Sequence, residues 1–253
     1  MDKYLNLTYV GHSTIYIDMD GTQLLTDPLL NRWIWHLRRK DTPIHENVRN
    51  KVDTILVSHA HRDHLDLTSL MLFPRETQIA VPLGLGDFLR KKGFTNVTEV
   101  GEGERFRIGS LEIEATRAVH DGSRFPFGPG GETLGFKIVG SQTIYFPGDT
   151  ALFPEMAAIG PGLDIALLPV WGWGPTLGTG HLDPFQAAQA LELLRPRLAI
   201  PIHWGTLYPV GFNRISPNFL IDPPRLFKEY AAQLAPLVEV RILLPGEMLV
   251  VSS

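Results

Sequence analysis

The 253-residue sequence contains no cysteine, and this absence excludes several kinds of site at once. No disulfide, thiolate nucleophile, iron–sulfur cluster or cysteine-ligated zinc site can form. Any metal ion must therefore be bound by histidines and carboxylates.

A strong net charge and long apolar runs are also missing. The chain has 23 basic and 27 acidic residues, a formal net charge of −4, so we expect no general attraction to nucleic acid or to anionic lipid. Residues 1–4 do not resemble the start of a signal peptide, and no run reaches the roughly 18 apolar residues that a membrane span needs. We therefore predict a cytoplasmic protein with no nucleic-acid partner and no integral membrane segment.

Short alternating or β-branched runs recur along the chain and predict about twice as many strands as helices. The predicted strands span Leu5–Val10, Ser13–Met19, Gln23–Leu25, Thr54–Ser58, Gln78–Pro82, Leu111–Val119, Leu134–Val139, Thr143–Phe146, Asp164–Pro169, Leu198–Ile202, Val238–Leu243 and Met248–Val251. The predicted helices span Leu65–Phe73, Gly84–Lys92, Leu152–Ile159, Pro184–Leu194 and Pro223–Leu234. Asp183 is expected to cap the fourth helix, and Asp222 begins the fifth in the same way.

No linker or internal repeat divides these elements, so we predict a single domain over residues 1–253. Strand clusters in both halves, each with helices, predict an α/β fold in which two sheets lie face to face with helices outside. This arrangement is a four-layer αββα sandwich. Three irregular stretches are polar, aromatic or glycine-rich and are expected to contact substrate: Leu30–Asn50, Asp121–Glu132 and Trp171–Gly180.

Histidines gather directly after one apolar strand. Three of the nine, His59, His61 and His64, fall within six residues together with Asp63. In an extended segment His59 and His61 project to the same side, and a following turn brings Asp63 and His64 toward them. Neutral imidazoles with a carboxylate suit a divalent transition metal, zinc first. The alternative is a polar surface turn.

Three later residues follow apolar strands in the same manner: His120, Asp149 and His203. Each one alone would be an ordinary polar residue at a strand end. Their repetition at four strand ends indicates a common site instead.

The pattern His-x-His-x-Asp-His, followed by His, Asp and His at strand ends, resembles the metallo-β-lactamase superfamily of binuclear hydrolases over nearly the whole chain. The resemblance implies two divalent metal ions, zinc or alternatively manganese, and a hydroxide shared between them as the nucleophile. It assigns one metal to His59, His61 and His120, the other to Asp63, His64 and His203, and a bridging position to Asp149.

Four further segments narrow the resemblance: Val10–Thr14, Leu25–Pro28, Gly180–Pro184 and Ile202–Thr206. Together they resemble the subgroup that contains N-acyl-phosphatidylethanolamine-hydrolysing phospholipase D and, more distantly, ascorbate-phosphate lactonase. This implies hydrolysis of a phosphodiester in a small-molecule or lipid-like substrate. The alternatives are a lactone or carboxylic ester hydrolase with the same site and, in another class, a metal-binding module without turnover. A homo-oligomer is compatible with the sequence.

Two residues are expected to act in catalysis. Asp63 would orient the attacking oxygen in addition to binding metal or, alternatively, would bind metal alone. His181 would stabilise the oxyanion or protonate the leaving group, with a purely structural role as the alternative. His12 and Asp27, at the ends of early strands, are expected to support the ligands, with Asp27 fixing an imidazole through its free N–H. A hydrogen bond within the turn is the alternative for Asp27.

The expected substrate contacts are aromatic or basic. Trp33, Trp35, Arg38 and Arg39, with Lys40 beside them, would form an anion-binding lid or, alternatively, a solvated charge run. Aromatic residues of the two later loops would line the pocket or pack elsewhere, and Tyr208 would assist a carbonyl oxyanion or pack. The later loop aromatics are Phe125, Phe127, Trp171 and Trp173.

Overall fold

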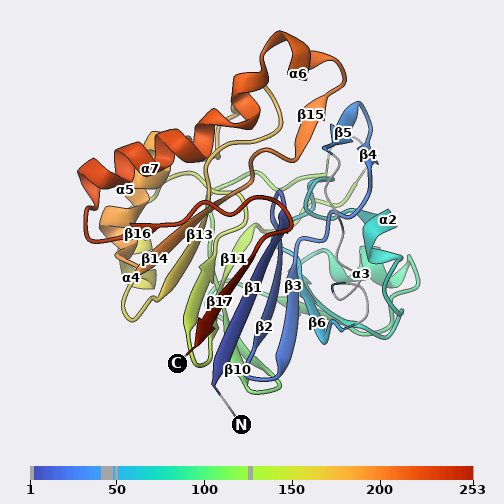
Figure 1. The fold of residues 1–253 in the computed structure, drawn as a ribbon. Helices are drawn as coiled ribbons and strands as arrows, with labels where there is room; N and C mark the ends of the chain where they lie inside the picture. The colour runs from blue at the N-terminus through green and yellow to red at the C-terminus, as the bar shows by residue number, and fades with distance from the viewer. Residues whose placement is uncertain (1–2, 41–47, 49–50, 125–127, 253) are drawn as a thin grey trace.

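Two seven-stranded sheets face each other in the computed structural model, which describes residues 3–40, 48, 51–124 and 128–252 (Figure 1). The first sheet has the order β17 (Met248–Ser252), β1 (Tyr4–Gly11), β2 (Thr14–Met19), β3 (Thr22–Thr26), β6 (Thr54–Leu56), β7 (Gln78–Pro82) and β8 (Val97–Val100). The second has the order β16 (Glu239–Val240), β14 (Leu198–Ile202), β13 (Ile165–Pro169), β12 (Thr143–Phe146), β11 (Leu134–Val139), β10 (Leu111–Arg117) and β9 (Arg105–Ile108).

The burial of each strand follows from its sequence pattern. β10 alternates, because Leu111, Ile113 and Ala115 enter the core while Glu112 and Glu114 face outward. β13 and β14 are parallel and apolar throughout, and all of their residues are buried. Parallel strands covered on both faces show such continuous apolar runs.

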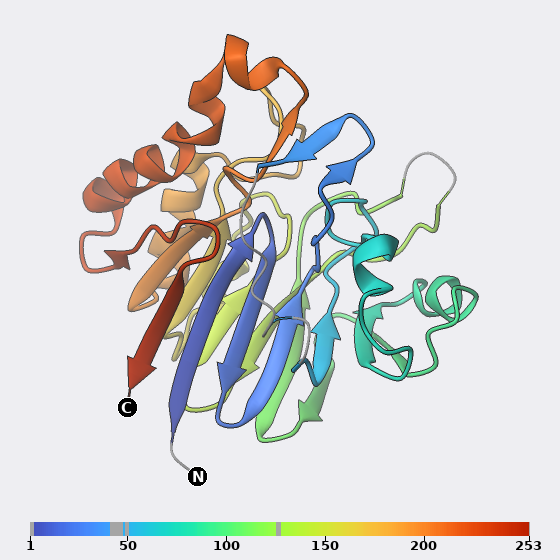
Figure 2. The same ribbon diagram turned by 45° about the vertical axis from the view of Figure 1, so that its right-hand side comes forward.

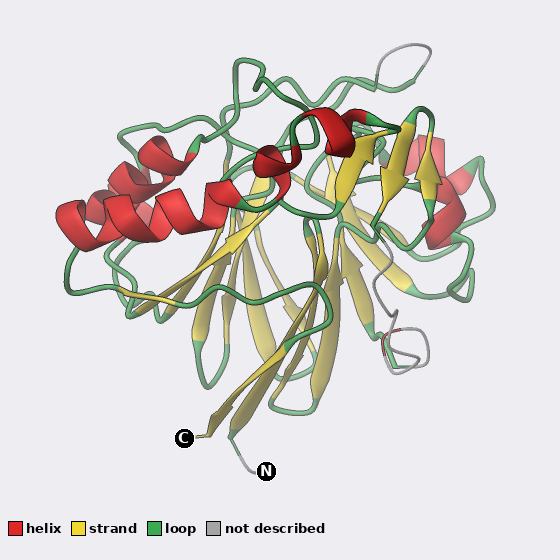
Figure 3. Cartoon of the chain, turned by 45° about the horizontal axis from the view of Figure 1, so that its top comes forward, coloured by secondary structure: helices red, strands yellow, loops and turns green. Residues whose placement is uncertain are grey.

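Helices cover the outer faces of both sheets, which confirms the predicted four-layer αββα sandwich (Figures 2 and 3). α2 (Leu67–Leu70) and α3 (Gly86–Arg90) pack on the first sheet, and α4 (Met156–Ile159), α5 (Pro184–Leu194) and α7 (Asp222–Leu234) pack on the second. Asp183 caps α5 as predicted, since its side chain accepts from the backbone N–H of Gln186 at 2.8 Å. Asp222 is instead the first residue of α7 and not its cap.

The largest buried cluster joins the two sheets to the helices that cover the second one. It contains Leu7 of β1, Ile113 of β10, Leu191 of α5 and Phe227 of α7, each 0% exposed. A separate cluster seals the first sheet against α2 and α3. This continuous apolar packing fixes how the two sheets meet, and therefore where their strand ends lie.

The segment Leu30–Asn50 differs from the prediction of an irregular loop. Its described part contains a hairpin of β4 (Trp33–Ile34) and β5 (Leu37–Arg39), and β15 (Leu207–Pro209) pairs with β5 in a third, three-stranded sheet. α6 (Phe212–Ile215) and η1 (Pro217–Leu220) connect β15 to α7. β8 and β9 were not predicted. α2 and α3 are shorter than predicted at both ends, and α4 consists only of the last turn of its predicted span.

Strands that run in one direction end at one edge of the sandwich. β1, β3 and β6 share a direction in the first sheet, as do β10, β12 and β14 in the second. In Figure 1 both chain termini lie at the opposite, lower edge, and the β4–β5 hairpin lies at the upper edge. Among the described residues, no helix is long and apolar enough to cross a membrane.

Candidate metal centre

The loop after β6 folds back on itself. The backbone N–H groups of His64 and Leu65 both donate to the carbonyl of His61, at 3.1 and 2.7 Å. Asp66 then caps α2 by accepting from the backbone N–H of Ser69 at 3.0 Å. This turn carries Asp63 and His64 back toward the two histidines that precede them.

The described residues bring the donor atoms of eight side chains into two adjacent clusters. Within each cluster all donor atoms lie within 4.8 Å of one another. The first cluster is His59, His61, His120 and Asp149, and the second is His12, Asp63, His64 and His203. All seven predicted ligands are therefore together, with His12 added.

Asp149 joins the two clusters. Its Oδ2 lies 3.1 Å from Nε2 of His64, and its Oδ1 lies 3.3 Å from Nε2 of His203. Burial alone would raise the pKa of Asp149, but the surrounding histidines, His203 and His64 foremost, lower it well below its usual value. Asp149 is therefore an ionised carboxylate of the first cluster that contacts two imidazoles of the second.

The outer nitrogen of three imidazoles is held by the protein. Nδ1 of His120 donates to the carbonyl of Gly180 at 2.9 Å, and Nδ1 of His203 donates to that of Trp171 at 2.7 Å. Nδ1 of His64 lies 2.7 Å from Oδ2 of Asp27. These contacts orient each ring so that its Nε2 faces the cluster. Burial would lower the pKa of His64, but the carboxylates of Asp149, Asp63 and Asp27 outweigh burial and raise that pKa well above its usual value.

Asp27 also reaches His59 through Ser58. Its carboxylate accepts from the backbone N–H and the hydroxyl of Ser58, at 2.7 and 2.6 Å. The Ser58 hydroxyl oxygen lies 2.9 Å from Nδ1 of His59. Burial raises the pKa of Asp27, whereas its contacts with His64 and Ser58 oppose that effect. The geometry is that expected for a residue that orients ligand imidazoles.

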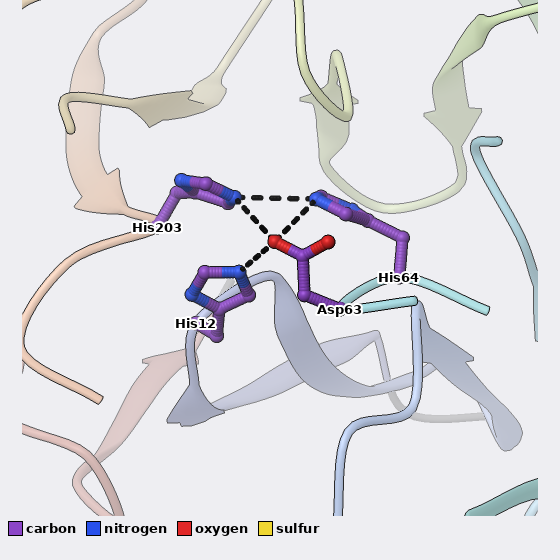
Figure 4. Close-up of side chains that lie close together, drawn as sticks. All are labelled: His12, Asp63, His64 and His203. Atoms are coloured by element: carbon purple, nitrogen blue, oxygen red, sulfur yellow. Dashed lines mark hydrogen bonds and ion pairs between the residues drawn. The ribbon is translucent and has the colours of Figure 1, made fainter. Parts of the chain in front are cut away.

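His12 lies closer to the centre than the sequence suggested. Its Nε2 is 2.9 Å from Oδ2 of Asp63, and Figure 4 shows contacts from His12, His64 and His203 converging on that carboxylate. Burial lowers the pKa of His12 to about 3, so its imidazole is neutral. His12 directly follows β1, just as the other candidate ligands follow their strands. This position in the sequence was the signal that could have placed His12 in the cluster.

The clusters offer donor atoms of the kind that divalent cations prefer. Nδ1 of His61 lies 3.0 Å from Nε2 of His120, and Nε2 of His64 lies 3.2 Å from Nε2 of His203. Among the described residues, buried Nε2 of His59 has no hydrogen-bond partner. Burial lowers the pKa of His120 to about 4 and that of His59 well below its usual value. Neutral imidazoles with converging lone pairs and ionised carboxylates are the donors that such metals prefer.

Backbone strain accompanies the site. Of six described non-glycine residues with positive φ, three contact the clusters or support them: His12 (57°), Asp27 (35°) and His203 (62°). Gly148, with φ 62°, approaches so closely that a Cβ there would lie 2.5 Å from the Cβ of Ser58. Strain of this kind persists where the surrounding structure enforces it, often at functional sites.

His181 lies at the open side of the clusters. Its Nε2 is 3.3 Å from Oδ2 of Asp149, and its side chain is 21% exposed. It belongs to the wall of a cavity of about 340 Å³ beside the metal centre. The lining residues are Ile34, Trp35, His36, Leu37, His61, Arg62, Asp63, Ser123, Asp149, Trp173 and His181.

The structure places the predicted substrate residues in different surroundings. Trp35 and Trp173 line the cavity. Phe125 and Phe127 lie outside the described residues. Apart from Arg39, the remaining aromatic and basic candidates lie within the described residues but do not line the cavity: Trp33, Arg38, Trp171 and Tyr208.

Arg39 does not reach the cavity, contrary to the expectation of an anion contact. It is 4% exposed, and its guanidinium donates to the backbone carbonyls of Val10, at 2.5 Å, and Leu29. Period two along β5 places Arg39 on the same buried face as Leu37. Arg62 lines the cavity instead, and it was not predicted because the motif treats its position as a spacer between candidate ligands.

Comparisons with known proteins agree with this geometry. The β-lactamase superfamily domain matches residues 22–204. A "UPF0173 metal-dependent hydrolase" of Opitutus terrae is 34% identical, over 96% of this chain and 98% of its own, and one of Rubrobacter xylanophilus is 30% identical, over 96% and 95%. The solved structure of Igni18, a metallo hydrolase from Ignicoccus hospitalis, superposes with a TM-score of 0.76 at 28% identity, covering 99% of each chain.

The chain therefore belongs to the β-lactamase superfamily, within its UPF0173 metal-dependent hydrolases. Its clustered histidines and carboxylates are the candidate metal ligands of that hydrolase fold.

Proposed function

We propose that this protein is a binuclear metal-dependent hydrolase that cleaves a phosphodiester. One observation carries the binuclear assignment: two donor clusters lie side by side, and the carboxylate of Asp149, a member of the first, contacts His64 and His203 of the second. Seven or eight donors exceed the four that a single tetrahedral zinc site uses. Zinc is the expected metal, with manganese as the alternative.

Each metal has its own donor set in this proposal. His59, His61 and His120 would hold one cation, Asp63, His64 and His203 would hold the other, and Asp149 would serve both. Two cations bound in this way supply Lewis acidity and lower the pKa of bound water toward neutrality. His12 holds the carboxylate of Asp63 in place through their 2.9 Å contact.

His181 is the proposed proton donor to the leaving group. Burial would lower its pKa, but the hydrogen bond with Asp149 outweighs that effect and raises it. Its partly exposed imidazole lines the cavity, where a leaving-group oxygen would lie. Asp63, which also lines the cavity, orients the attacking oxygen in this scheme.

A phosphodiester carries a permanent negative charge, and the cavity wall contains the permanent positive charge of Arg62. The resemblance to N-acyl-phosphatidylethanolamine-hydrolysing phospholipase D supports the same substrate class. Tyr208, the residue expected to assist a carbonyl oxyanion, pairs with Arg38 across the third sheet and lies outside the cavity lining. We therefore prefer the phosphodiester to the lactone or ester alternative.

Parallel assays test this choice. Protein loaded with zinc or manganese is assayed with bis(p-nitrophenyl) phosphate, with a panel of lactones and with p-nitrophenyl acetate. The kcat/KM values are compared between these substrates, and between Asp149→Ala and the unchanged protein. We expect the phosphodiester to be hydrolysed fastest and Asp149→Ala to be inactive. Faster lactone or ester hydrolysis would establish the carbonyl alternative, and metal binding without any turnover would indicate a binding module.

A further inference from the structure

Trp35 occupies the tip of the β4–β5 hairpin in an unfavourable setting. Its φ is 51°, a left-handed conformation that is rare for bulky side chains, and its side chain is 60% exposed. The backbone is therefore strained at this position, and burial of the indole does not compensate for the strain. Its ring lines the cavity beside the metal centre. A contact with bound substrate would account for a residue that stability does not explain.

Arg62 lies against that indole. The carbon at the centre of its guanidinium group is 4.6 Å from the centroid of the Trp35 ring, within cation–π distance. Arg62 also stands between two donor residues, His61 and Asp63, in sequence. The contact therefore holds a permanent positive charge at the cavity wall, beside the residues that bind metal.

Trp173 extends the aromatic wall from a different part of the chain. It is 36% exposed, and its ring meets the imidazole of His36 edge to face, with centroids 5.5 Å apart. His36 follows Trp35 at the hairpin tip, so the loop that precedes α5 is connected to the hairpin through this contact. Two exposed indoles and one guanidinium thus belong to the same cavity.

From these contacts we propose that Trp35, Trp173 and Arg62 form a subsite for a flat aromatic substituent on an anionic substrate. The indoles contact the flat group, and Arg62 binds the negative charge near the reacting phosphorus. This inference rests on the proposed phosphodiester hydrolysis and narrows its substrate class to aryl phosphodiesters.

Binding of two phosphonates tests the aromatic part without requiring turnover. Phenylphosphonate and methylphosphonate share one charged group and differ only in the flat substituent, and calorimetry on zinc-loaded protein gives the ratio of their Kd values. We expect Trp35→Ala and Trp173→Ala each to reduce the preference for phenylphosphonate about three- to tenfold. Trp33→Ala is the matched control, because Trp33 is 51% exposed on the same hairpin but outside the cavity.

Trp35→Gly separates a role in binding from a role in folding. Glycine adopts positive φ without strain, so this variant should keep or raise Tm while losing the preference for phenylphosphonate. An unchanged preference in the Trp35 and Trp173 variants, or an equal loss in Trp33→Ala, would overturn the aromatic subsite.

Arg62→Gln tests the charged part. We expect this substitution to weaken the binding of both phosphonates about tenfold or more, while the ratio of their Kd values is retained. The amount of bound metal should stay at the level of the unchanged protein. Arg38→Ala is the matched control, since Arg38 stacks on Trp33 outside the cavity. Equal affinities in Arg62→Gln and Arg38→Ala would refute the anion contact. A different result would contradict the proposed function itself: the unchanged protein would hydrolyse no phosphodiester.

Discussion

Asp27 holds two histidines with one carboxylate. It accepts from the backbone N–H and hydroxyl of Ser58, contacts Nδ1 of His64, and reaches His59 through the same hydroxyl. All of these groups are 0% exposed, so water cannot replace a lost partner. The carboxylate therefore links the folding of the strand ends to the orientation of the imidazoles.

Asp27→Asn should weaken metal binding while keeping the shape of the residue. An amide has one acceptor oxygen, and its NH₂ group would face groups that donate. We expect a loss of about 10- to 100-fold in zinc affinity, measured by competition with a chelator. Asp53→Asn, at an exposed hydrogen bond with the backbone of Gln23, is the control. Unchanged zinc affinity in Asp27→Asn would contradict the role assigned here.

His181→Ala should separate catalysis from metal binding. Because its Nε2 contacts Asp149 from the exposed side, we expect the metal content to remain and kcat to fall by about two to four orders of magnitude, the range for a positioned acid–base group or oxyanion donor. Metal analysis and steady-state kinetics on the same preparation measure both. Loss of a metal ion would make His181 a ligand, and an unchanged kcat would make it structural.

At the scale of elements, the third small sheet is attached to the sandwich by Arg39. Its guanidinium donates to carbonyls near the ends of β1 and β3, and Lys40 N–H donates to the carbonyl of Thr206 at 2.8 Å. The β4–β5 hairpin, which contributes Trp35 to the cavity, depends on these contacts.

Replacing Arg39 by Ala should destabilise the fold by about 2–4 kcal/mol, because buried carbonyls lose their charged donor. Arg38→Ala, one residue earlier on the opposite face of β5, should cost less than about 1 kcal/mol. Urea unfolding of both variants gives the comparison. Equal and small effects would show that Arg39 does not anchor the hairpin.

Arg124 supports the ligand loop from the segment after β10. It is 7% exposed, and its Nη1 donates to the carbonyls of Ala60 and Leu65, at 3.0 and 2.7 Å, on either side of the candidate ligands Asp63 and His64. Burial, followed by the nearby charge of Arg62, lowers its pKa to about 10. Arg124 therefore remains charged near neutral pH and acts as a positioning residue.

Arg124→Ala should lower zinc affinity by about tenfold or more, because the loop would no longer be held at both ends. Arg117→Ala is a matched control at the end of β10, where the exposed guanidinium lies 3.8 Å from Glu155 and over the ring of Phe153, away from the ligand loop. Competition with a chelator measures the zinc affinity of both variants. If Arg124→Ala binds zinc as tightly as Arg117→Ala, the positioning role is wrong.

At the scale of the whole molecule, the residues that the sequence predicts as ligands lie together because of a simple property of the fold. His120, Asp149 and His203 each follow an apolar strand, and strands of one direction end at one edge of the sandwich. The αββα layers followed from apolar periodicity in both halves of the chain. The single-domain organisation stays a prediction.

The cavity wall could not be predicted in the same way. Composition could not show which cation of a basic segment faces inward, although period two along β5 places Arg39 beside buried Leu37. Arg62 reaches the cavity from the turn between two candidate ligands, and Trp35 reaches it from a strained hairpin tip. Both depend on backbone dihedral angles that tertiary contacts determine, not on local preference.

The number of metal ions bound per chain tests the account most directly. Protein saturated with zinc or manganese and then freed of excess metal should contain two ions per chain by elemental analysis, because Asp149 joins two donor clusters. Asp149→Ala should lose metal and activity together. One ion or fewer per chain after saturation would contradict the binuclear centre.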